Sequence, residues 1–433
     1  MNFKDSANDY LNSFNNFRDN KTGSKLELYQ LDNLYRTNWI ARKICDAYAE
    51  DMTRAGVEWL ADENISALLD KEFNRLKIWS ALTKAIKYAR LYGGSLAVIS
   101  IEGLDFDSYK KPLSSGIGFN GLIPFSRVEI TANLQSLLTG ARFGEPASYK
   151  IQPAIINQAF DVHASRCIRF LGAELPPNLA RLNELWGDSV IQSMYDRLEF
   201  FNDATDSTNE LMKRAYLRFL GVSGFWQAMT SSDPAHANNI AMAAQMINEV
   251  QNISGLTVAD KDDTFSNMSY SFGGVKDVLD QFGQQIAGAT GIPLVRLFGM
   301  SPSGFSTGET DLKNYYSSIY AAQESALRDP IATIARLILE NHNISDEIDF
   351  KFISLDQPSN LEKIQVGTAC TTAILQALES GIINSERAII ELKKQSAFSG
   401  LFSSISAQDI EAQKGLELPT LLPPLGEQEN GSV

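Results

Sequence analysis

The side chains that could perform acid–base, nucleophilic or metal chemistry are few and widely separated in this sequence. None of them lies in a C-x-x-C, H-E-x-x-H, G-x-S-x-G, Walker A or G-x-G-x-x-G pattern. Cysteines this far apart cannot form a sequence-local metal cluster, so we expect small buried thiols. The sequence therefore predicts no catalytic residue, no metal and no cofactor. The residues concerned are Cys45, Cys167, Cys370, His163, His236 and His342.

Size and composition are typical of a folded protein with two or three lobes. The chain has 433 residues, of which 44% are hydrophobic and 21% are charged. No apolar run is long enough to span a membrane, and the polar N-terminus lacks the apolar segment of a secretory signal. An odd number of cysteines fits a reducing cytoplasm. We therefore expect neither membrane residence nor export.

The net charge of −14 is the reverse of what a DNA-gripping protein carries. Binding through phosphates needs a basic surface, because neutralised phosphates release counterions. The acidity can be an ordinary solvated surface. If the protein does meet DNA, the acidity predicts a surface that repels the duplex and lets it slide.

The order of expected elements places a mixed lobe first and long helices after it. Apolar spacing and turn residues provide the boundaries. Helices are expected at residues 31–52, 65–92, 188–219, 233–252, 275–289, 309–327, 329–341 and 359–398, the last one broken at Gly381 and capped again at Asn384 or Ser385. Strands are expected at residues 95–101, 122–130, 148–151, 167–171, 220–226, 255–258, 264–272 and 349–353.

Charge is distributed unevenly along the expected helix 188–219, for which Asp188 or Ser189 is the natural N-cap. Carboxylates come early and basic residues come late, an arrangement that complements the helix dipole. The late basic residues could equally contact DNA, and the sequence leaves both readings open. The acidic residues are Asp188, Asp196, Glu199, Asp203 and Asp206, and the basic residues are Lys213, Arg214 and Arg218.

A segment rich in Gly, Ser and Pro separates two of the expected helices, at residues 297–308. Met300 and Phe305 are its large apolar side chains, and such a segment can change shape with little strain. It can be a plain surface loop. Glu309 and Asp311, which follow it, fit a helix N-terminus better than a metal site.

Short motifs, taken in order, resemble the portal proteins of tailed bacteriophages, in a portal family once catalogued only as a phage-associated domain of unknown function. Each motif is weak alone, but their order over residues 30–400 is fairly specific. The motifs are LYGGS (91–95), VHASRCIRF (162–170), WGDSV (186–190), ATGIPLVRLFG (289–299), SPSG (301–304) and GETDLKNYY (308–316).

The resemblance implies an α+β, predominantly helical fold with the portal architecture of wing, stem helices, clip, tunnel loop and crown. Its parts would be a flexible N-terminal arm (1–30), a mixed α/β wing (31–187), a first stem helix (188–219), a clip (220–273), a second stem helix (274–297), a tunnel loop (298–309), a long wing helix with a return strand (310–357), crown helices (358–407) and a flexible C-terminal tail (408–433).

The resemblance also implies a non-enzymatic function. The chain would form a homo-oligomeric ring, usually a dodecamer, at one capsid vertex of a virion assembled in the bacterial cytoplasm. Double-stranded DNA would pass through it, and the terminase large subunit, a head–tail adaptor, and the major capsid and scaffolding proteins would contact it. The channel-lining residues would be Met300, Ser301, Ser303, Gly304, Phe305, Ser306, Thr307 and Glu309, with possible stem or clip contacts from Lys213, Arg214 and Arg218.

Two alternatives belong to other classes. One is another phage head–tail adaptor or minor capsid protein, although the length and the order of long helices favour a portal. The other is a 2H-type phosphoesterase, which needs two H-x-[ST] motifs. His163-Ala164-Ser165 matches this motif, whereas His236 and His342 do not. One isolated histidine is a poor acid–base system. We expect His163 to end a strand and make a local hydrogen bond.

Overall fold

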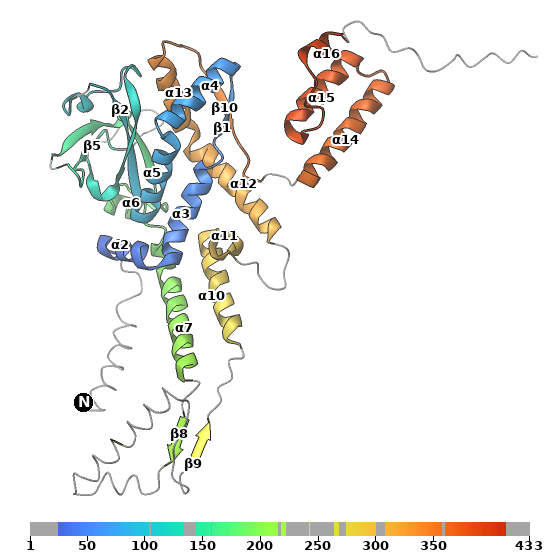
Figure 1. Ribbon diagram of the computed structural model, residues 1–433. Helices are drawn as coiled ribbons and strands as arrows, with labels where there is room; N and C mark the ends of the chain where they lie inside the picture. The colour runs from blue at the N-terminus through green and yellow to red at the C-terminus, as the bar shows by residue number, and fades with distance from the viewer. Residues whose placement is uncertain are drawn as a thin grey trace, which may run out of the picture. The chain divides into compact units, whose positions relative to one another are not determined.

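The computed structural model describes most of the chain and divides it into two compact units, residues 1–353 and 354–433 (Figure 1). Each unit is described by itself. The described residues are 25–103, 105–133, 144–156, 158–214, 218–221, 242, 264–267, 274–299, 308–356 and 360–412.

The first unit combines helices with short antiparallel sheets, so the predicted α+β, predominantly helical class is confirmed. Its helices are α2 (Leu28–Thr37), α3 (Trp39–Thr53), α4 (Glu63–Arg75), α5 (Ile78–Tyr92), α6 (Pro177–Leu182), α7 (Tyr195–Arg214), α10 (Val275–Thr290), α11 (Leu294–Phe298), α12 (Glu309–Ala326) and α13 (Arg328–Asn341). Its strands are β1 (Val57–Leu60), β2 (Gly94–Ile101), β3 (Phe119–Ser126), β4 (Ile130–Ala132), β5 (Ser148–Ile151), β6 (Phe160–His163), β7 (Cys167–Leu171), β8 (Arg218–Gly221), β9 (Thr264–Asn267) and β10 (Asp349–Phe352).

The core of this unit lies on both faces of a three-stranded sheet with the order β3-β2-β7. Its central strand β2 is buried along most of its length, which explains its nearly continuous apolar sequence. Helix α5 covers one face of this sheet, and α3 packs on α5. On the other face, Leu96 and Val98 join Tyr149 and Val162 of the sheet β4-β5-β6 in one apolar cluster. Strands β1 and β10 form a separate pair, as do β8 and β9.

Three motifs of the sequence meet where α5 ends and β2 begins. Gly93 has a φ of +86°, and a Cβ atom there would lie 2.4 Å from the Gly187 carbonyl oxygen. A Cβ atom on Gly94 would lie 2.2 Å from the ring of Trp186. Strand β7 carries the end of the motif 162–170 and pairs Phe170 with Ser95, and just beyond it the Gly172 amide donates to the Gly93 carbonyl at 3.0 Å. Only glycine fits this close approach of backbones, so the three motifs specify one packing junction.

Substitution of Gly94 tests this junction. We expect Gly94→Ala to lower the free energy of unfolding by about 1–3 kcal/mol, because the added methyl group must displace the buried Trp186 ring. Gly288→Ala is the matched control, since nothing lies within 4 Å of a Cβ atom at this position in α10. The control is expected to be neutral or stabilising. Urea unfolding followed by circular dichroism measures both variants, and equal stability of Gly94→Ala and the wild type would contradict the assignment.

The structure corrects three of the predicted helices and one predicted strand. The helix expected at 31–52 is divided at Asn38, whose backbone is extended and whose side chain caps α3. The strand expected at 122–130 is interrupted by a turn at Arg127–Glu129, between β3 and β4.

The helix expected at 65–92 is interrupted, since Lys77 takes the left-handed conformation with φ 52° between α4 and α5. The helix expected at 188–219 begins only at Tyr195 and is described to Arg214, so neither Asp188 nor Ser189 is its N-cap. Asp188 instead exchanges two backbone hydrogen bonds with Ala173, at 2.7 and 2.8 Å, which holds the chain extended there.

The described ends of the chain also differ from the loose segments that were expected. Helix α2 begins within the predicted arm 1–30, and Leu26 is buried with its amide donating to the Gln192 side chain at 2.7 Å. In the predicted tail 408–433, residues up to Ala412 belong to the short helix α16 (Ala407–Ala412). Asp409 accepts from the Ser406 amide at 2.7 Å, which caps that helix.

The second unit is a helical hairpin followed by α16. Its long helices are α14 (Asn360–Glu379) and α15 (Ser385–Ser399). The predicted break at Gly381 and the predicted cap at Asn384 are confirmed, because the Asn384 side chain accepts from the Arg387 amide. In the described part of both units, no helix is long and apolar enough to cross a membrane.

Candidate functional site

Two described residues near the segment 300–307 in sequence, Arg296 and Tyr315, converge on one buried carboxylate, Asp51 of α3. Its side chain is fully buried, although a carboxylate normally lies in water. The cause is its position: Asp51 follows Ile40, Ile44 and Ala47 at helical spacing, so it lies on the face that α3 turns toward the core. A carboxylate there must be paired and hydrogen-bonded.

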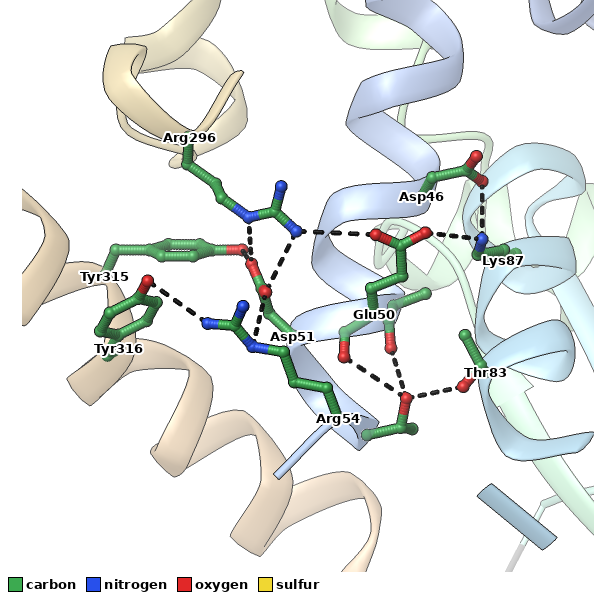
Figure 2. A network of polar contacts seen from close by, with 11 residues as sticks. Asp46, Glu50, Asp51, Arg54, Thr83, Lys87, Arg296, Tyr315 and Tyr316 are labelled. Atoms are coloured by element: carbon green, nitrogen blue, oxygen red, sulfur yellow. Dashed lines mark hydrogen bonds and ion pairs between the residues drawn. The ribbon is translucent and has the colours of Figure 1, made fainter. Parts of the chain in front are cut away.

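Arg296 and Tyr315 provide that pairing (Figure 2). Arg296 donates from Nε to Asp51 Oδ2 at 2.9 Å and from Nη2 to Oδ1 at 3.2 Å, a bidentate arrangement. The Tyr315 hydroxyl donates to Oδ2 at 2.9 Å. Arg54, a half-exposed residue, places Nε 3.3 Å from Oδ1. Asp51 therefore has a hydrogen-bonded partner from each of two distant segments of the chain.

These two segments flank residues 300–307. Arg296 belongs to α11, a short helix that starts after Pro293 and ends at Gly299, whose φ of +73° ends the helix. Tyr315 belongs to α12, which starts after Gly308. The same carboxylate thus fixes the chain just before and just after this segment. We call Asp51, Arg296 and Tyr315 the Asp51 anchor.

Electrostatics favour one protonation state of the anchor. Burial raises the pKa of Tyr315, and the charge and hydrogen bond of Asp51 raise it further, so the hydroxyl stays a donor. Burial alone lowers the pKa of Arg296, but its hydrogen bond and ion pair with Asp51 outweigh burial and raise it. The guanidinium therefore remains charged at every physiological pH.

Further polar contacts connect the anchor with its surroundings. Arg296 Nη2 lies 3.6 Å from Glu50, and Glu50 accepts from Lys87 of α5 at 3.1 Å. Gln323 of α12 donates to the Met52 carbonyl at 2.9 Å, satisfying one of the free carbonyls at the end of α3. Polar contacts thereby hold the helices α3, α5, α11 and α12 together (Figure 2).

Helices α7 and α10 form a pair below this site in Figure 1, packed along one another. Leu198 of α7 and Ile286 of α10 are fully buried. The rings of Phe201 and Phe298 lie 5.9 Å apart, which connects the pair to α11.

The face of α7 opposite the buried side is acidic. Its carboxylates recur at alternating spacings of three and four residues, so they share one side of the helix. All are exposed except Glu199, which is half-exposed. These residues are Asp196, Glu199, Asp203, Asp206 and Glu210, and we call them the acidic stripe.

Among the residues predicted to line the channel or contact DNA, Glu309 is the one whose side chain the structure describes. Glu309 is the first residue of α12, where the helix dipole favours a carboxylate, and it is exposed and pairs with Lys313 at 3.2 Å. The residues predicted to form a tunnel loop lie outside the described residues; they are Met300, Ser301, Ser303, Gly304, Phe305, Ser306 and Thr307. Lys213 and Arg214 end α7 and Arg218 begins β8, and their side chains also lie outside what the structure describes.

His163 behaves as predicted. It ends β6, and its Nδ1 lies 2.9 Å from the Ser165 hydroxyl, a local hydrogen bond. Among the described residues, no group of three or more histidines, cysteines or carboxylates could hold a metal ion. The sequence reasoning missed the Asp51 anchor. The available signal was a carboxylate at an apolar position of the expected helix 31–52.

Comparison with known proteins identifies the family. Residues 29–375 match the sequence model of the family described as phage portal protein. Since this match covers most of the chain, the chain belongs to the phage portal protein family.

Curated relatives include one of similar length and two longer ones. An uncharacterized protein of Haemophilus influenzae (strain ATCC 51907 / DSM 11121 / KW20 / Rd) is 29% identical over 397 residues, covering 90% of this chain and 87% of the relative. Anti-CBASS protein Acb1 of Sphingomonas paeninsulae is 29% identical over 363 residues, covering 79% of this chain and 57% of the relative. A protein of the same name from Caulobacter sp. (strain RHG1) is 28% identical, with 52% of its length covered. This chain therefore spans little more than half of the two Acb1 proteins.

Solved structures share the fold. A chain in the virion of a native gene transfer agent particle has a TM-score of 0.55 and 12% identity, with 86% of this chain and 96% of that chain covered. A chain in the neck of the native particle, computed with C12 symmetry, has a TM-score of 0.52 and 13% identity, with 84% and 92% covered. At such low identity the likeness establishes the portal fold alone.

Proposed function

We propose that this chain is the subunit of a closed ring at one vertex of a phage capsid, and that DNA enters and leaves through its central channel. The observation that carries the proposal is the Asp51 anchor. One buried carboxylate holds both flanks of residues 300–307, the segment that the family resemblance places at the narrowest part of the channel. A loop that contacts a moving duplex needs fixed ends and a deformable middle, and the glycines and serines of this segment supply the latter.

Twelve subunits is the proposed ring size. The support is the likeness to a neck chain whose particle was computed with C12 symmetry. A ring of identical subunits uses one surface of each copy against a different surface of the next, so the rotation between copies closes the assembly.

The acidic stripe of α7 supports passage of DNA without tight binding. Five carboxylates per subunit, repeated around a ring, would give the stem region a strongly negative surface. Phosphates are repelled by such a surface, so the duplex meets few attractive positions at which it could stall. A duplex that does not adhere to the channel wall can be moved through the channel by an external motor.

The proposed partners are those that the family resemblance implies. Residues 220–273 would form the clip, where the terminase large subunit docks during packaging and a head–tail adaptor docks afterwards. The wing would contact the major capsid and scaffolding proteins. Assembly would take place in the cytoplasm of the host bacterium, and the finished ring would lie at the portal vertex of the virion.

Native mass spectrometry of the purified full-length protein tests the ring. We expect a species whose mass corresponds to twelve copies of the 47.8 kDa chain, because closed symmetry permits one size. A nearby whole number of copies would revise the ring size alone. A protein that stays monomeric, even with scaffolding and capsid proteins added, would contradict the proposal.

Two of the relatives are named Anti-CBASS protein Acb1, a different description from portal protein, and the sequence itself left a 2H-type phosphoesterase as an alternative. We propose that this chain has no catalytic function, because the paired H-x-[ST] motifs of a 2H-type phosphoesterase are absent from its sequence. Incubation of the pure protein with cyclic oligonucleotides and with DNA tests this proposal. Hydrolysis that is lost in the His163→Ala variant would contradict it and support the phosphoesterase.

A further inference from the structure

An apolar groove lies in the first unit, between helix α5 and the loop that follows strand β5. It encloses about 590 Å³, and several large apolar side chains that line it are exposed. They are Phe106, Ile123, Val128, Ile155 and Ile156, with exposed fractions of 37, 43, 52, 97 and 48%. Soluble proteins seldom gather such side chains at one place unless another segment covers them. We therefore expect the groove to be covered in the native protein.

The charged side chains that line the groove are already engaged by groups of the same chain. Asp32 accepts from the Tyr92 hydroxyl at 2.6 Å, and Glu129 accepts from the Ser126 hydroxyl at 2.9 Å. The Lys84 ammonium lies 5.5 Å from the centre of an aromatic ring of α5. The groove therefore suits an apolar occupant without charge better than an ionic ligand.

The described part of the chain begins beside this groove. Lys25 donates from Nζ to the Asn183 side-chain oxygen, and Arg127 donates to the same oxygen at 2.7 Å. Arg127 is directly followed by Val128, which lines the groove. Helix α2, which begins three residues after Lys25, contributes Asp32 to the lining. The segment that precedes Lys25 is therefore attached next to the groove.

The sequence of that segment has apolar residues at helical spacing. They are four, three, four and three residues apart, so on a helix they would share one side, with asparagines and aspartates opposite. A helix over residues 3–17 would be about 22 Å long. Residues 18–24 would connect it to Lys25 and can span at most about 24 Å. We call the apolar residues the aromatic stripe; they are Phe3, Ala7, Tyr10, Phe14 and Phe17.

We propose that residues 3–17 form a helix whose aromatic stripe packs into the groove of its own chain. A helix of this length is marginally stable alone in water and gains its stability from packing of one face. The groove offers the apolar surface that such a face needs, and the stretch 10–17 brings no charge to it. The same chain is the favoured source, because a short connection keeps the local concentration of the segment high. The inference concerns the single subunit and goes beyond its place in a ring.

Hydrogen exchange of the full-length protein, followed by mass spectrometry, tests the docking. We expect the amides of residues 10–17 to exchange about tenfold or more slowly in the wild type than in the double variant Val128→Asp, Ile155→Asp, because amides of a packed helix exchange only during local openings. Both replaced side chains are exposed, so the core stays intact. The matched control, Leu60→Asp with Ile117→Asp, replaces exposed apolar residues outside the groove and should exchange like the wild type. Equal exchange in the wild type and the groove variant overturns the inference.

Photo-cross-linking identifies the occupant. A benzophenone side chain replaces Phe14 in the full-length protein, and isotopically light and heavy chains are mixed before assembly. We expect adducts within one chain, attached at residues 123–128 or 153–156. The matched control places the benzophenone at Asn12, on the opposite side of the helix, and should give no adduct in the groove. Adducts between light and heavy chains would assign the groove to a neighbouring copy, and these, or adducts outside the groove, overturn the inference.

Discussion

Replacing Asp51 by alanine is expected to lower the free energy of unfolding by about 3–5 kcal/mol. The substitution leaves Arg296 mostly buried without its bidentate partner and leaves the Tyr315 hydroxyl without its acceptor. An unpaired charge in a site of low polarity costs more than the pair contributes. Urea unfolding followed by circular dichroism measures the loss. Packaging should fall as well, because both flanks of residues 300–307 lose their common attachment.

Two matched variants separate the anchor from ordinary surface electrostatics. Glu50→Gln removes a half-exposed carboxylate from the same network and is expected to cost about 0–1 kcal/mol. The double variant Asp51→Leu, Arg296→Met removes both buried charges together and is expected to recover part of the loss. The anchor is wrongly described if Asp51→Ala is no less stable than Glu50→Gln.

Deleting residues 300–306 is expected to leave the ring intact and to impair DNA packaging or retention. The deletion removes Met300 and Phe305, which supply the apolar contacts of the proposed tunnel loop, but leaves Arg296 and Tyr315 with Asp51. Ring assembly is checked by native mass spectrometry. Packaging is measured as nuclease-protected DNA per particle in complementation of a phage that lacks the portal.

A length-matched control distinguishes loss of the apolar residues from shortening of the chain. Met300→Ser with Phe305→Ser keeps the number of residues while removing both large apolar side chains. If the loop acts through its apolar contacts, this variant packages nearly as poorly as the deletion. Normal packaging by the deletion itself would rule out residues 300–306 as the tunnel loop.

Much of the fold follows from local sequence. Gly93 and Gly94 predict the end of a helix and the apolar run after them predicts a strand, and the structure places the end of α5 and the strand β2 there. Asn384 caps α15 as its side chain predicts. Such features depend on neighbouring residues, so periodicity and capping preferences locate them.

The features that sequence reasoning missed depend on distant contacts. Lys77 interrupts the expected helix 65–92 in the left-handed conformation, although the apolar spacing continues through it and helix propensity does not mark a lysine as a break. Asp188 is a good N-cap residue, yet its backbone pairs with Ala173 instead.

The Asp51 anchor could not be predicted from the sequence for the same reason, because it depends on contacts between distant residues. Asp51 and Arg296 are 245 residues apart, and periodicity carries no information on such pairs. The motifs of the family resemblance nevertheless contain both Arg296 and Tyr315. They indicated the correct segments, and a carboxylate on the apolar face of α3 was the remaining clue.

Cryo-electron microscopy of the purified full-length assembly tests the central claim most directly. The account predicts a closed ring in which residues 300–307 project into the central channel, with the Asp51 anchor behind them. An assembly without a channel, or a ring that carries residues 300–307 on its outer surface, would contradict it.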